Sequence, residues 1–318
     1  MRKIELVTAS GLEERLKECL EQRHMPDCFL YLGDSGVKNW LDLSDSSEFP
    51  ISARLTELLV QGLPAISRRV PSPLDVVSIG VGSGEKERLL LGALLERGIR
   101  CRYLAVDISS HMVDQALDAA ADIEVDQTGI VAFLEDLPAL KGLWNAPVLL
   151  CLLGNNFCNY EADYLLDTVR RELGPDDLFL FDCHLLPTTG GDGVPGREQV
   201  EQAYRSLPNA RFNTDPLVRR GLAPDGCQFH LELTPTDSAM GTLYRTHKWI
   251  HILRDAEIRC GQGTVSLAAG DVVRLGFTCK YTRRQIEGYL ERHGFETLEQ
   301  VTSPDGDNLL ALVGTRPR

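Results

Sequence analysis

The fold of this chain follows from one stretch, Val76-Val77-Ser78-Ile79-Gly80-Val81-Gly82-Ser83-Gly84-Glu85-Lys86. A short β-branched run ends in three alternating glycines, and a charged helix start follows. Glycine lets the chain turn sharply off a strand and lets the backbone approach a ligand closely. The next apolar run, 102–106, ends in Asp107, where a carboxylate can accept hydrogen bonds from ribose hydroxyls. The stretch therefore predicts a nucleoside-binding strand–helix–strand unit.

The glycine spacing narrows the ligand. A dinucleotide fingerprint, G-x-G-x-x-G counted from Gly80, requires glycine at the position of Glu85, and a carboxylate there would repel a pyrophosphate. The spacing found, G-x-G-x-G, resembles the loop of class I methyltransferases, whose ligand S-adenosylmethionine has no phosphate. The alternative is a strand–helix turn that binds nothing. The pattern favours S-adenosylmethionine over a nicotinamide cofactor.

Composition and charge exclude several classes of partner. The chain has 318 residues, with 43% hydrophobic and 25% charged residues, as in ordinary globular proteins. Its net charge of −13 argues against a nucleic-acid partner, which would call for a basic face. The start lacks a signal-peptide pattern, and the longest strongly apolar run, 148–153, is too short to cross a membrane. We expect a cytoplasmic protein of undetermined oligomeric state.

Cysteine usage indicates a reduced protein without a metal. The nine cysteines form no C-x-x-C pair, as expected where thiols stay reduced. Cys227 and His230 have a ligand-like spacing, but no second pair accompanies them. We expect an ordinary strand or loop at these positions.

Alternating strands and helices predict a parallel sheet. The fold class expected is α/β, a class I methyltransferase Rossmann-like sheet with an inserted β-rich accessory substrate domain. We expect core strands at about 75–79, 102–106, 129–134, 147–153, 178–182 and 309–314, and helices at about 10–24, 53–69, 86–97, 110–121, 161–173, 197–206 and 282–293.

The expected domains follow from this alternation. Residues 1–70 form an N-terminal helical segment that caps the substrate. Residues 71–184 and 282–318 form the core that binds S-adenosylmethionine. Residues 185–281 form the accessory substrate domain, because 227–278 alternate like strands and 185–196 are rich in glycine and proline, which predicts a mobile loop or lid.

Ligands of open α/β sheets bind beyond the carboxyl ends of the strands. Glu135 and Asp136 could meet the adenine amino group or a ribose hydroxyl there, or could simply begin a helix. The residues expected around this crevice are Gly80, Gly82, Gly84, Asp107, Glu135, Asp136 and Gly154.

Further motifs carry a resemblance that spans most of the chain. At 80–88 the sequence resembles the histidine-specific N-α-methyltransferase family of ergothioneine biosynthesis, which writes a glycine loop followed by Ser/Gly-Glu-Lys-x-Arg. The likeness continues at 153–160, Leu-Gly-Asn-Asn-Phe-Cys-Asn-Tyr, and at 277–281, Phe-Thr-Cys-Lys-Tyr. Tyr31 matches a family tyrosine near the N-terminus. The chain is identified as a divergent member.

The resemblance implies roles for matching residues. Lys86 would lie near the carboxylate of the donor and Asp107 on its ribose. Asn159 would grip the backbone groups of an amino-acid substrate, and Tyr31 would face its amine. Tyr204 would bind the substrate carboxylate, although it could equally pack the accessory helix. Asn159, Tyr31 and Tyr204 are thus the expected catalytic residues.

One departure from the family bears on the substrate. The family reads an imidazole ring with a glutamate and a serine, and this chain has Gly276 and Thr278 at those places. A missing carboxylate removes a charge-assisted hydrogen bond and relaxes the choice of substrate. The space freed by Gly276 could take a larger or apolar side chain. We therefore expect Gly276 and Thr278 in the substrate site and an acceptor other than histidine.

The function expected is a methyltransferase of secondary metabolism that acts on the amine of an amino acid or related small molecule. Transfer from a sulfonium is an in-line displacement that needs alignment and exclusion of water rather than a metal. Two alternatives stay open: an enzyme that transfers the aminocarboxypropyl arm of the donor or cyclises it, and a non-catalytic protein that binds the donor.

Overall fold

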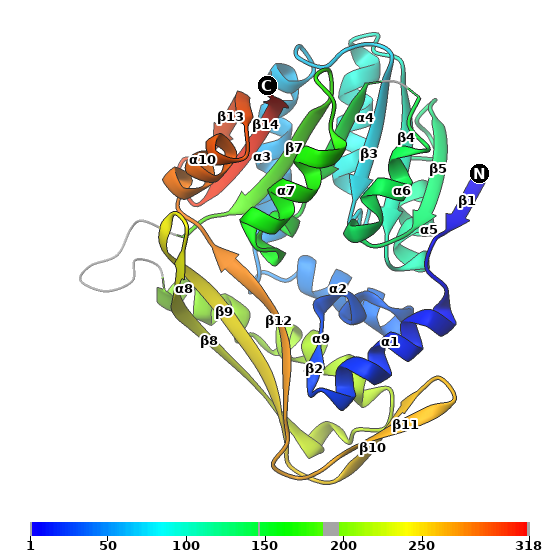
Figure 1. Ribbon diagram of the computed structural model, residues 1–318, viewed down its shortest axis with the longest axis vertical. Coiled ribbons are helices and arrows are strands. Elements are labelled where there is room, and N and C mark those ends of the chain that lie inside the picture. The colour runs from blue at the N-terminus through cyan, green and yellow to red at the C-terminus, as the bar shows by residue number, and fades with distance from the viewer. Residues whose placement is uncertain (1, 146, 187–196, 317–318) are drawn as a thin grey trace.

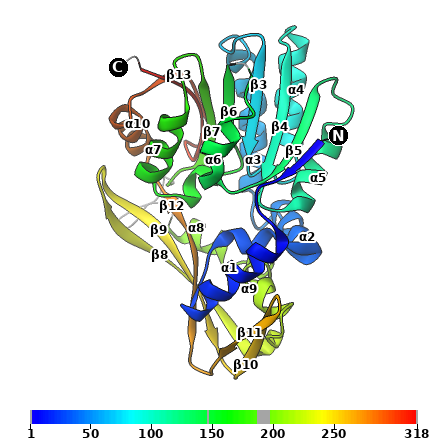
Figure 2. The same ribbon diagram turned by 45° about the vertical axis from the view of Figure 1, so that its right-hand side comes forward.

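The structure is a computed structural model that describes residues 2–145, 147–186 and 197–316. A large sheet with helices on both faces lies above a smaller layer of strands and helices (Figure 1). We call the smaller layer the cap. Figure 2 shows the two layers from a second direction, with α1 and α2 lying below the sheet.

Among the described residues the large sheet has eight strands, and only β14 runs against the direction of the others. β14 runs antiparallel to both β7 and β13, and the other neighbours are parallel. This topology confirms the predicted α/β class and its Rossmann-like sheet. In spatial order the strands are β1 (Arg2–Glu5), β5 (Asp126–Val131), β4 (Cys101–Asp107), β3 (Leu74–Ile79), β6 (Val148–Leu152), β7 (Leu178–His184), β14 (Asn308–Thr315) and β13 (Phe295–Thr302).

Helices bury both faces of this sheet, which explains why its central strands β3 and β6 are buried along their whole length. Side chains of α3 (Ile51–Ile66), α4 (Glu85–Glu96) and α5 (Ser110–Ala119) share one hydrophobic core with the sheet. Those of α6 (Leu137–Lys141), α7 (Ala162–Glu172) and α10 (Arg283–Arg292) share the core on the other face. The carboxyl ends of the strands lie between these two helical layers, and a ligand can bind there.

The cap joins segments that are far apart in the sequence. Its hydrophobic core combines Leu16 and Phe29 from the N-terminal part with Phe212, Ile250 and Val273. Its helices are α1 (Ala9–Glu21), α2 (Gly33–Ser44), α8 (Arg197–Tyr204) and α9 (Leu207–Val218), with short turns η1 (Asp27–Tyr31) and η4 (Pro224–Gly226). Its strands are β2 (His24–Met25), β12 (Val272–Lys280), β9 (Gly241–Ile252) and β8 (Cys227–Ser238), and the hairpin β10 (Ala256–Cys260) with β11 (Gly263–Leu267).

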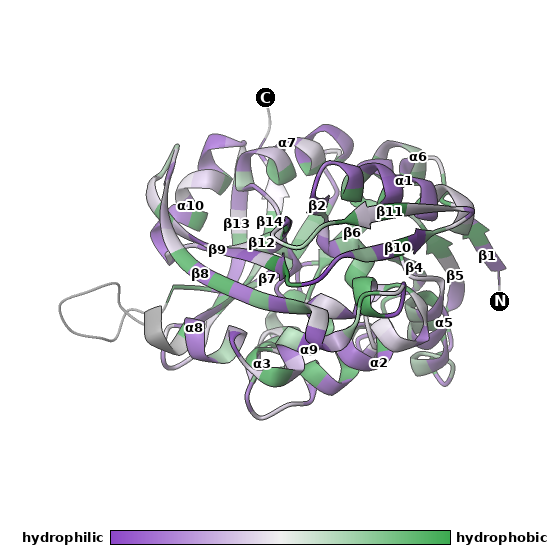
Figure 3. Ribbon diagram, turned by 90° about the horizontal axis from the view of Figure 1, so that it is seen from below, coloured by the Kyte–Doolittle hydropathy of each residue, from purple (hydrophilic) through white to green (hydrophobic). Residues whose placement is uncertain are grey.

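Hydrophobic and hydrophilic residues alternate along β8 in the four-stranded sheet of the cap (Figure 3), as in a sheet that buries one face. One irregularity lies in β12, where the register against β9 shifts between Arg274 and Phe277. Residues 275 and 276 of β12 therefore stand opposite the single residue Lys248 of β9. Such a β-bulge bends its strand and redirects nearby side chains.

Several elements differ from the sequence prediction. The strand expected at 129–134 begins at Asp126 and ends at Val131, and Leu134 starts a short turn, η2 (Leu134–Asp136). β1, α2, α9 and β13 were not predicted as elements. The expected loop at 185–196 lies mostly outside the described residues. The division into 1–70, 71–184 with 282–318, and 185–281 stays a prediction. No described helix is long and apolar enough to span a bilayer.

Candidate functional site

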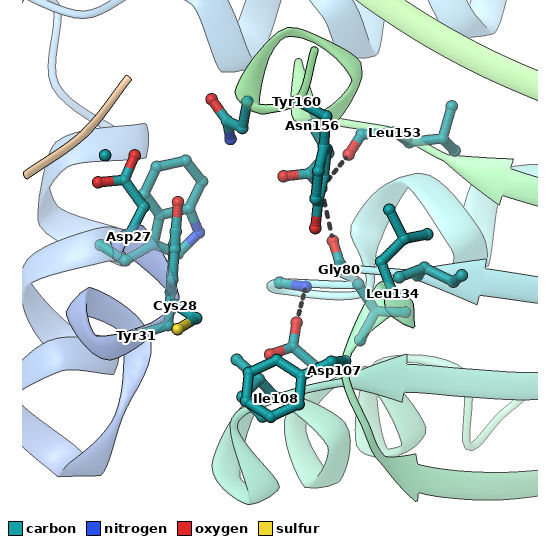
Figure 4. Close-up of a pocket in the computed structure, with 18 of the residues that line it drawn as sticks. Asp27, Cys28, Tyr31, Gly80, Asp107, Ile108, Leu134, Leu153, Asn156 and Tyr160 are labelled. Carbon is teal, nitrogen blue, oxygen red and sulfur yellow. Dashed lines mark hydrogen bonds between the residues drawn. The ribbon is translucent and has the colours of Figure 1, made fainter. Parts of the chain in front are cut away.

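A cavity of about 330 Å³ opens between the carboxyl edge of the large sheet and the cap. This volume is within the range of small-molecule sites. Gly80, Asp107 and Ile108 lie on one side of the cavity, and Asp27, Cys28 and Tyr31 face them from the other (Figure 4). The residues from the sequence prediction that line it are Tyr31, Gly80, Gly82, Lys86, Asp107, Glu135, Gly154, Asn159 and Gly276.

The three glycines of the loop after β3 have different structural roles. All three have positive φ, at 72°, 54° and 76° for Gly80, Gly82 and Gly84. A Cβ on Gly82 would point toward Trp40 across the cavity, 3.5 Å from its Nε1. A Cβ on Gly84 would lie 2.5 Å from Cα of Ala116 in α5. Gly84 therefore permits helix packing and does not line the cavity, whereas Gly80 and Gly82 do.

Asp107, at the end of β4, presents a buried carboxylate beside this loop. Its oxygens accept the backbone N–H groups of Ser109 at 2.9 Å and Gly82 at 3.4 Å. Burial raises the pKa of Asp107 to about 6. At neutral pH the group is ionised, and its remaining lone pairs can accept hydrogen bonds from a ligand in the cavity.

The loop after β6 is fixed by hydrogen bonds from two neighbouring strands. The carboxylate of Asp182, at β7, accepts the N–H groups of Gly154 at 2.9 Å and Asn155 at 2.6 Å. Nδ2 of Asn156 donates to the backbone oxygens of Gly80 at 3.1 Å and Leu153 at 2.7 Å (Figure 4). These bonds tie the loop to the glycine turn of β3, so both lie at one end of the cavity.

Lys86, in the first turn of α4, lines the same end of the cavity. It forms no ion pair with any residue that the structure describes, and its ammonium is therefore available to an anionic ligand group. Glu135 also lines the cavity, on an exposed turn. Asp136 does not line it, because its Oδ2 accepts the N–H of Phe133 at 2.9 Å within the same turn.

Tyr31 is held in the opposite wall by aromatic contacts and by an arginine. Its ring packs edge-on against Trp40 and Phe212, with centroids 5.4 and 5.3 Å apart. The guanidinium of Arg219 donates to the backbone oxygen of Phe29 at 3.2 Å and to that of Leu32, fixing the turn that carries Tyr31. Burial raises the pKa of Tyr31 well above its usual value, so its phenol keeps its proton.

Asn159, at the end of η3 (Asn156–Asn159), is oriented by Thr278. Oγ1 of Thr278 donates to Oδ1 of Asn159 at 3.1 Å. Thr278 is buried behind Asn159 and does not itself line the cavity. Asn159 does line it, and its amide NH₂ group is left to donate to a ligand.

The space above Gly276 is occupied. A Cβ built on Gly276 would lie 2.4 Å from Cγ of Asp27 and 2.5 Å from its Oδ1. The expectation that Gly276 frees room for a larger or apolar side chain is therefore wrong. Asp27, from η1, therefore places its carboxylate against Gly276, and both residues line the cavity.

Tyr204 lies outside the cavity lining. Its ring packs edge-on against Phe49, with centroids 5.2 Å apart, and Nζ of Lys280 lies 5.1 Å from its centre. The side chain is 5% exposed. Its role as an anchor for a substrate carboxylate stays a prediction.

Sequence reasoning missed other residues that line the cavity, among them Asp27, Cys28, Trp40, Asn156 and Tyr160. The amide of Asn156 stood inside a recognised loop, but its partner Gly80 is far away in the sequence. Asp27 and Cys28 precede Tyr31 by one turn, and this proximity was the only signal for them.

No group of three or more His, Cys, Asp or Glu among the described residues could hold a metal. The ring of His230, whose spacing from Cys227 resembles that of metal ligands, stacks on the ring of Trp249, with ring centroids 5.2 Å apart.

A family model described as histidine-specific methyltransferase, SAM-dependent, matches residues 11–314. A comparison with curated proteins gives no match. Solved structures resemble the chain only distantly. An S-adenosylmethionine-dependent methyltransferase from Clostridium acetobutylicum is 12% identical, with 83% of this chain and 92% of that one covered and a TM-score of 0.42. A 1,6-didemethyltoxoflavin-N1-methyltransferase from Burkholderia thailandensis, solved with S-adenosylhomocysteine, is 13% identical, with 83% and 79% covered and a TM-score of 0.40.

Proposed function

The chain belongs to the histidine-specific, SAM-dependent methyltransferase family, and from this premise we propose that it methylates the amine of an amino acid or a related small molecule. S-adenosylmethionine is its methyl donor. The observation that carries the proposal is that one cavity joins the glycine loop and Asp107 to Tyr31 on the opposite wall, and that Asn159, from the loop after β6, lines the same cavity.

The donor would occupy the end of the cavity formed by the large sheet. Asp107 would accept hydrogen bonds from the ribose hydroxyls, and Gly80 and Gly82 leave room for close approach of the backbone. The free ammonium of Lys86 would pair with the carboxylate of the donor. Glu135 would meet the adenine amino group or a ribose hydroxyl.

The acceptor would occupy the part of the cavity between the cap and η3, where Asn159 contacts Thr278 of β12. The amide NH₂ of Asn159 would donate to a backbone oxygen of the amino acid, and the protonated phenol of Tyr31 would orient its amine. Most of an α-amine is protonated at physiological pH, and only its neutral fraction has the lone pair that attacks the methyl carbon. The protein then needs to align the amine lone pair with the methyl carbon and to exclude water.

The proposal allows more acceptors than the sequence prediction did, because that prediction disfavoured histidine. The argument against histidine rested on the missing carboxylate at Gly276, and Asp27 places a carboxylate against that position. Histidine therefore belongs among the acceptors to be tested. Tyr204 has no role in this proposal, because it does not line the cavity.

The test is to incubate the protein with S-adenosylmethionine and each amino acid, and to follow products by mass. We expect at least one amino acid to gain the mass of one CH₂ unit for each methyl group added, because the methyl replaces a hydrogen, with S-adenosylhomocysteine as the second product. Release of methylthioadenosine would instead indicate aminocarboxypropyl transfer or cyclisation. Tight binding of S-adenosylhomocysteine without turnover on any amine would indicate a binding protein.

Asn159→Ala tests the acceptor half of the site. Loss of a positioning contact lowers catalytic efficiency by about a hundredfold, whereas affinity for S-adenosylhomocysteine stays unchanged. Asn145→Ala, at an exposed position away from the cavity, is the matched control. Catalytic efficiency within about twofold of the native enzyme in Asn159→Ala would remove Asn159 from the proposal.

A further inference from the structure

We infer that the ion pair of Asp27 and Lys248 reads the side chain of the acceptor and selects one that ends in an N–H or O–H donor. This inference rests on the proposed function, since it concerns the acceptor end of the same cavity. Neither residue stood out in the sequence. Three features of the structure carry it: the fixed position of the carboxylate, its free hydrogen-bonding capacity, and the separation along β12 of the residues that Asp27 and Asn159 contact.

Asp27 is fixed from behind by Lys248. Nζ of Lys248 donates to Oδ1 at 3.0 Å and to Oδ2 at 2.8 Å. The Lys248 side chain is 6% exposed and that of Asp27 is 17% exposed, so the pair is largely removed from water. Two hydrogen bonds from one buried ammonium group hold the carboxylate in a defined orientation.

The β-bulge of β12 makes room for this arrangement. The bulge places residues 275 and 276 opposite Lys248. Gly276 has no side chain, and any Cβ there would overlap the Asp27 carboxylate. The glycine, the bulge and the lysine thus act together to present Asp27 to the cavity, which Asp27 and Gly276 both line.

The carboxylate has acceptor capacity left for a ligand. Two carboxylate oxygens offer about four lone-pair sites, and Lys248 uses one on each oxygen. An N–H or O–H group of the acceptor can take another. Because an aliphatic side chain would desolvate this carboxylate without offering a bond, it is disfavoured. A carboxylate side chain is disfavoured by like charge.

The position of Asp27 relative to Asn159 sets the length of that side chain. Asn159 contacts Thr278, and Asp27 contacts Gly276, two residues earlier in the same strand. Two strand residues span about 7 Å. An amino acid whose backbone is held at Asn159 would therefore reach Asp27 only with a long side chain, such as that of glutamine, tyrosine or histidine.

The experiment compares acceptors that differ mainly in the polar end group. Tyrosine and phenylalanine form one pair, and glutamine and methionine form another. The first readout is thermal stabilisation of the protein loaded with S-adenosylhomocysteine, which reports binding of each amino acid without turnover. The second is methyl transfer from S-adenosylmethionine. We expect the polar member of at least one pair to be preferred by about tenfold or more.

Two variants assign the preference to the ion pair. Asp27→Leu with Lys248→Met removes both charges together and avoids leaving one buried alone. We expect the preference to fall to within about twofold while S-adenosylhomocysteine still binds. Asp42→Leu with Arg211→Met, at an exposed ion pair, is the matched control and should keep the preference. Should the double variant fail to fold, Gly276→Ala displaces the Asp27 carboxylate and Gly92→Ala, whose Cβ meets nothing within 4 Å, is its control.

The outcomes separate the two proposals. Methyl transfer by the native protein with equal or reversed preference in both pairs would overturn the inference and leave the proposed function standing. The same holds for a preference that survives the loss of Asp27 and Lys248. Absence of methyl transfer to any amine would overturn the proposed function, and the stabilisation measurements would then still show whether Asp27 selects polar ligands.

Discussion

Asp182 accepts the backbone N–H of Gly154 at 2.9 Å, and through this bond β7 fixes the loop that follows β6. Its other oxygen accepts the N–H of Asn155. In Asp182→Asn one acceptor oxygen becomes an NH₂ group that faces an N–H donor. We expect the loop to loosen, affinity for S-adenosylhomocysteine to fall about tenfold, and the melting temperature to fall by several degrees. Calorimetric titration and thermal denaturation measure the two effects.

The matched control is Asp177→Asn. Asp177 also accepts two backbone N–H groups, those of Val148 at 2.8 Å and Gly174 at 2.7 Å, but neither of these residues lines the cavity, whereas Gly154 does. This variant should lose stability to a similar extent and bind S-adenosylhomocysteine normally. Equal loss of affinity in both variants would mean that Asp182 affects the donor site only through global stability.

Donor binding should depend on pH through Asp107. Burial raises the pKa of this carboxyl to about 6. The ionised form, present above that pH, is the one that accepts hydrogen bonds from ribose. Affinity for S-adenosylhomocysteine should therefore hold above pH 6 and fall about tenfold between pH 7 and pH 5, because a proton must leave before the donor binds. In Asp107→Asn affinity should be lower at pH 7 and nearly constant over this range; an unchanged slope would assign the titration to another group.

The large sheet was predictable where local signals were strong. β3, α4 and β4 combine buried apolar strands with a glycine turn, and their predicted bounds differ from the observed ones by one residue. β13 was missed because it is an edge strand whose sequence, Phe-Glu-Thr-Leu-Glu-Gln, shows no clear alternation. α9 contains Pro216 and two asparagines, which lower its helix propensity; packing against α2 compensates.

The two ends of the cavity also differed in how well the sequence predicted them. The donor end follows from one contiguous motif, since Gly80, Gly82, Lys86 and the nearby Asp107 belong to a single strand–helix–strand unit. The acceptor end depends on contacts between distant segments. Asp27 reaches Gly276 because β2 pairs with β12, and no local pattern encodes that pairing.

Two alanine variants in the glycine loop distinguish an effect on stability from an effect on donor binding. In Gly82→Ala a left-handed backbone costs about 1 kcal/mol, and the new methyl group enters the cavity. We expect a modest loss of stability and a loss of affinity for S-adenosylhomocysteine of tenfold or more. In Gly84→Ala the methyl group collides with the backbone of Ala116, so stability should fall by several kcal/mol. Urea denaturation and titration of the folded protein distinguish the two; greater destabilisation by Gly82→Ala would contradict this assignment.

Thr278 is expected to act on catalysis through Asn159. Its Oγ1 donates to Oδ1 of Asn159, so Thr278→Val removes the bond that leaves the amide NH₂ facing the cavity. We expect kcat/KM for the acceptor to fall about tenfold, as for a lost hydrogen bond of about 1.4 kcal/mol, while affinity for S-adenosylhomocysteine stays within twofold. Thr278→Ser keeps the hydroxyl and should restore activity, and Thr234→Val, on β8 outside the cavity lining, should change neither quantity. If Thr278→Ser were as impaired as Thr278→Val, the lost methyl packing rather than the hydrogen bond to Asn159 would explain the defect.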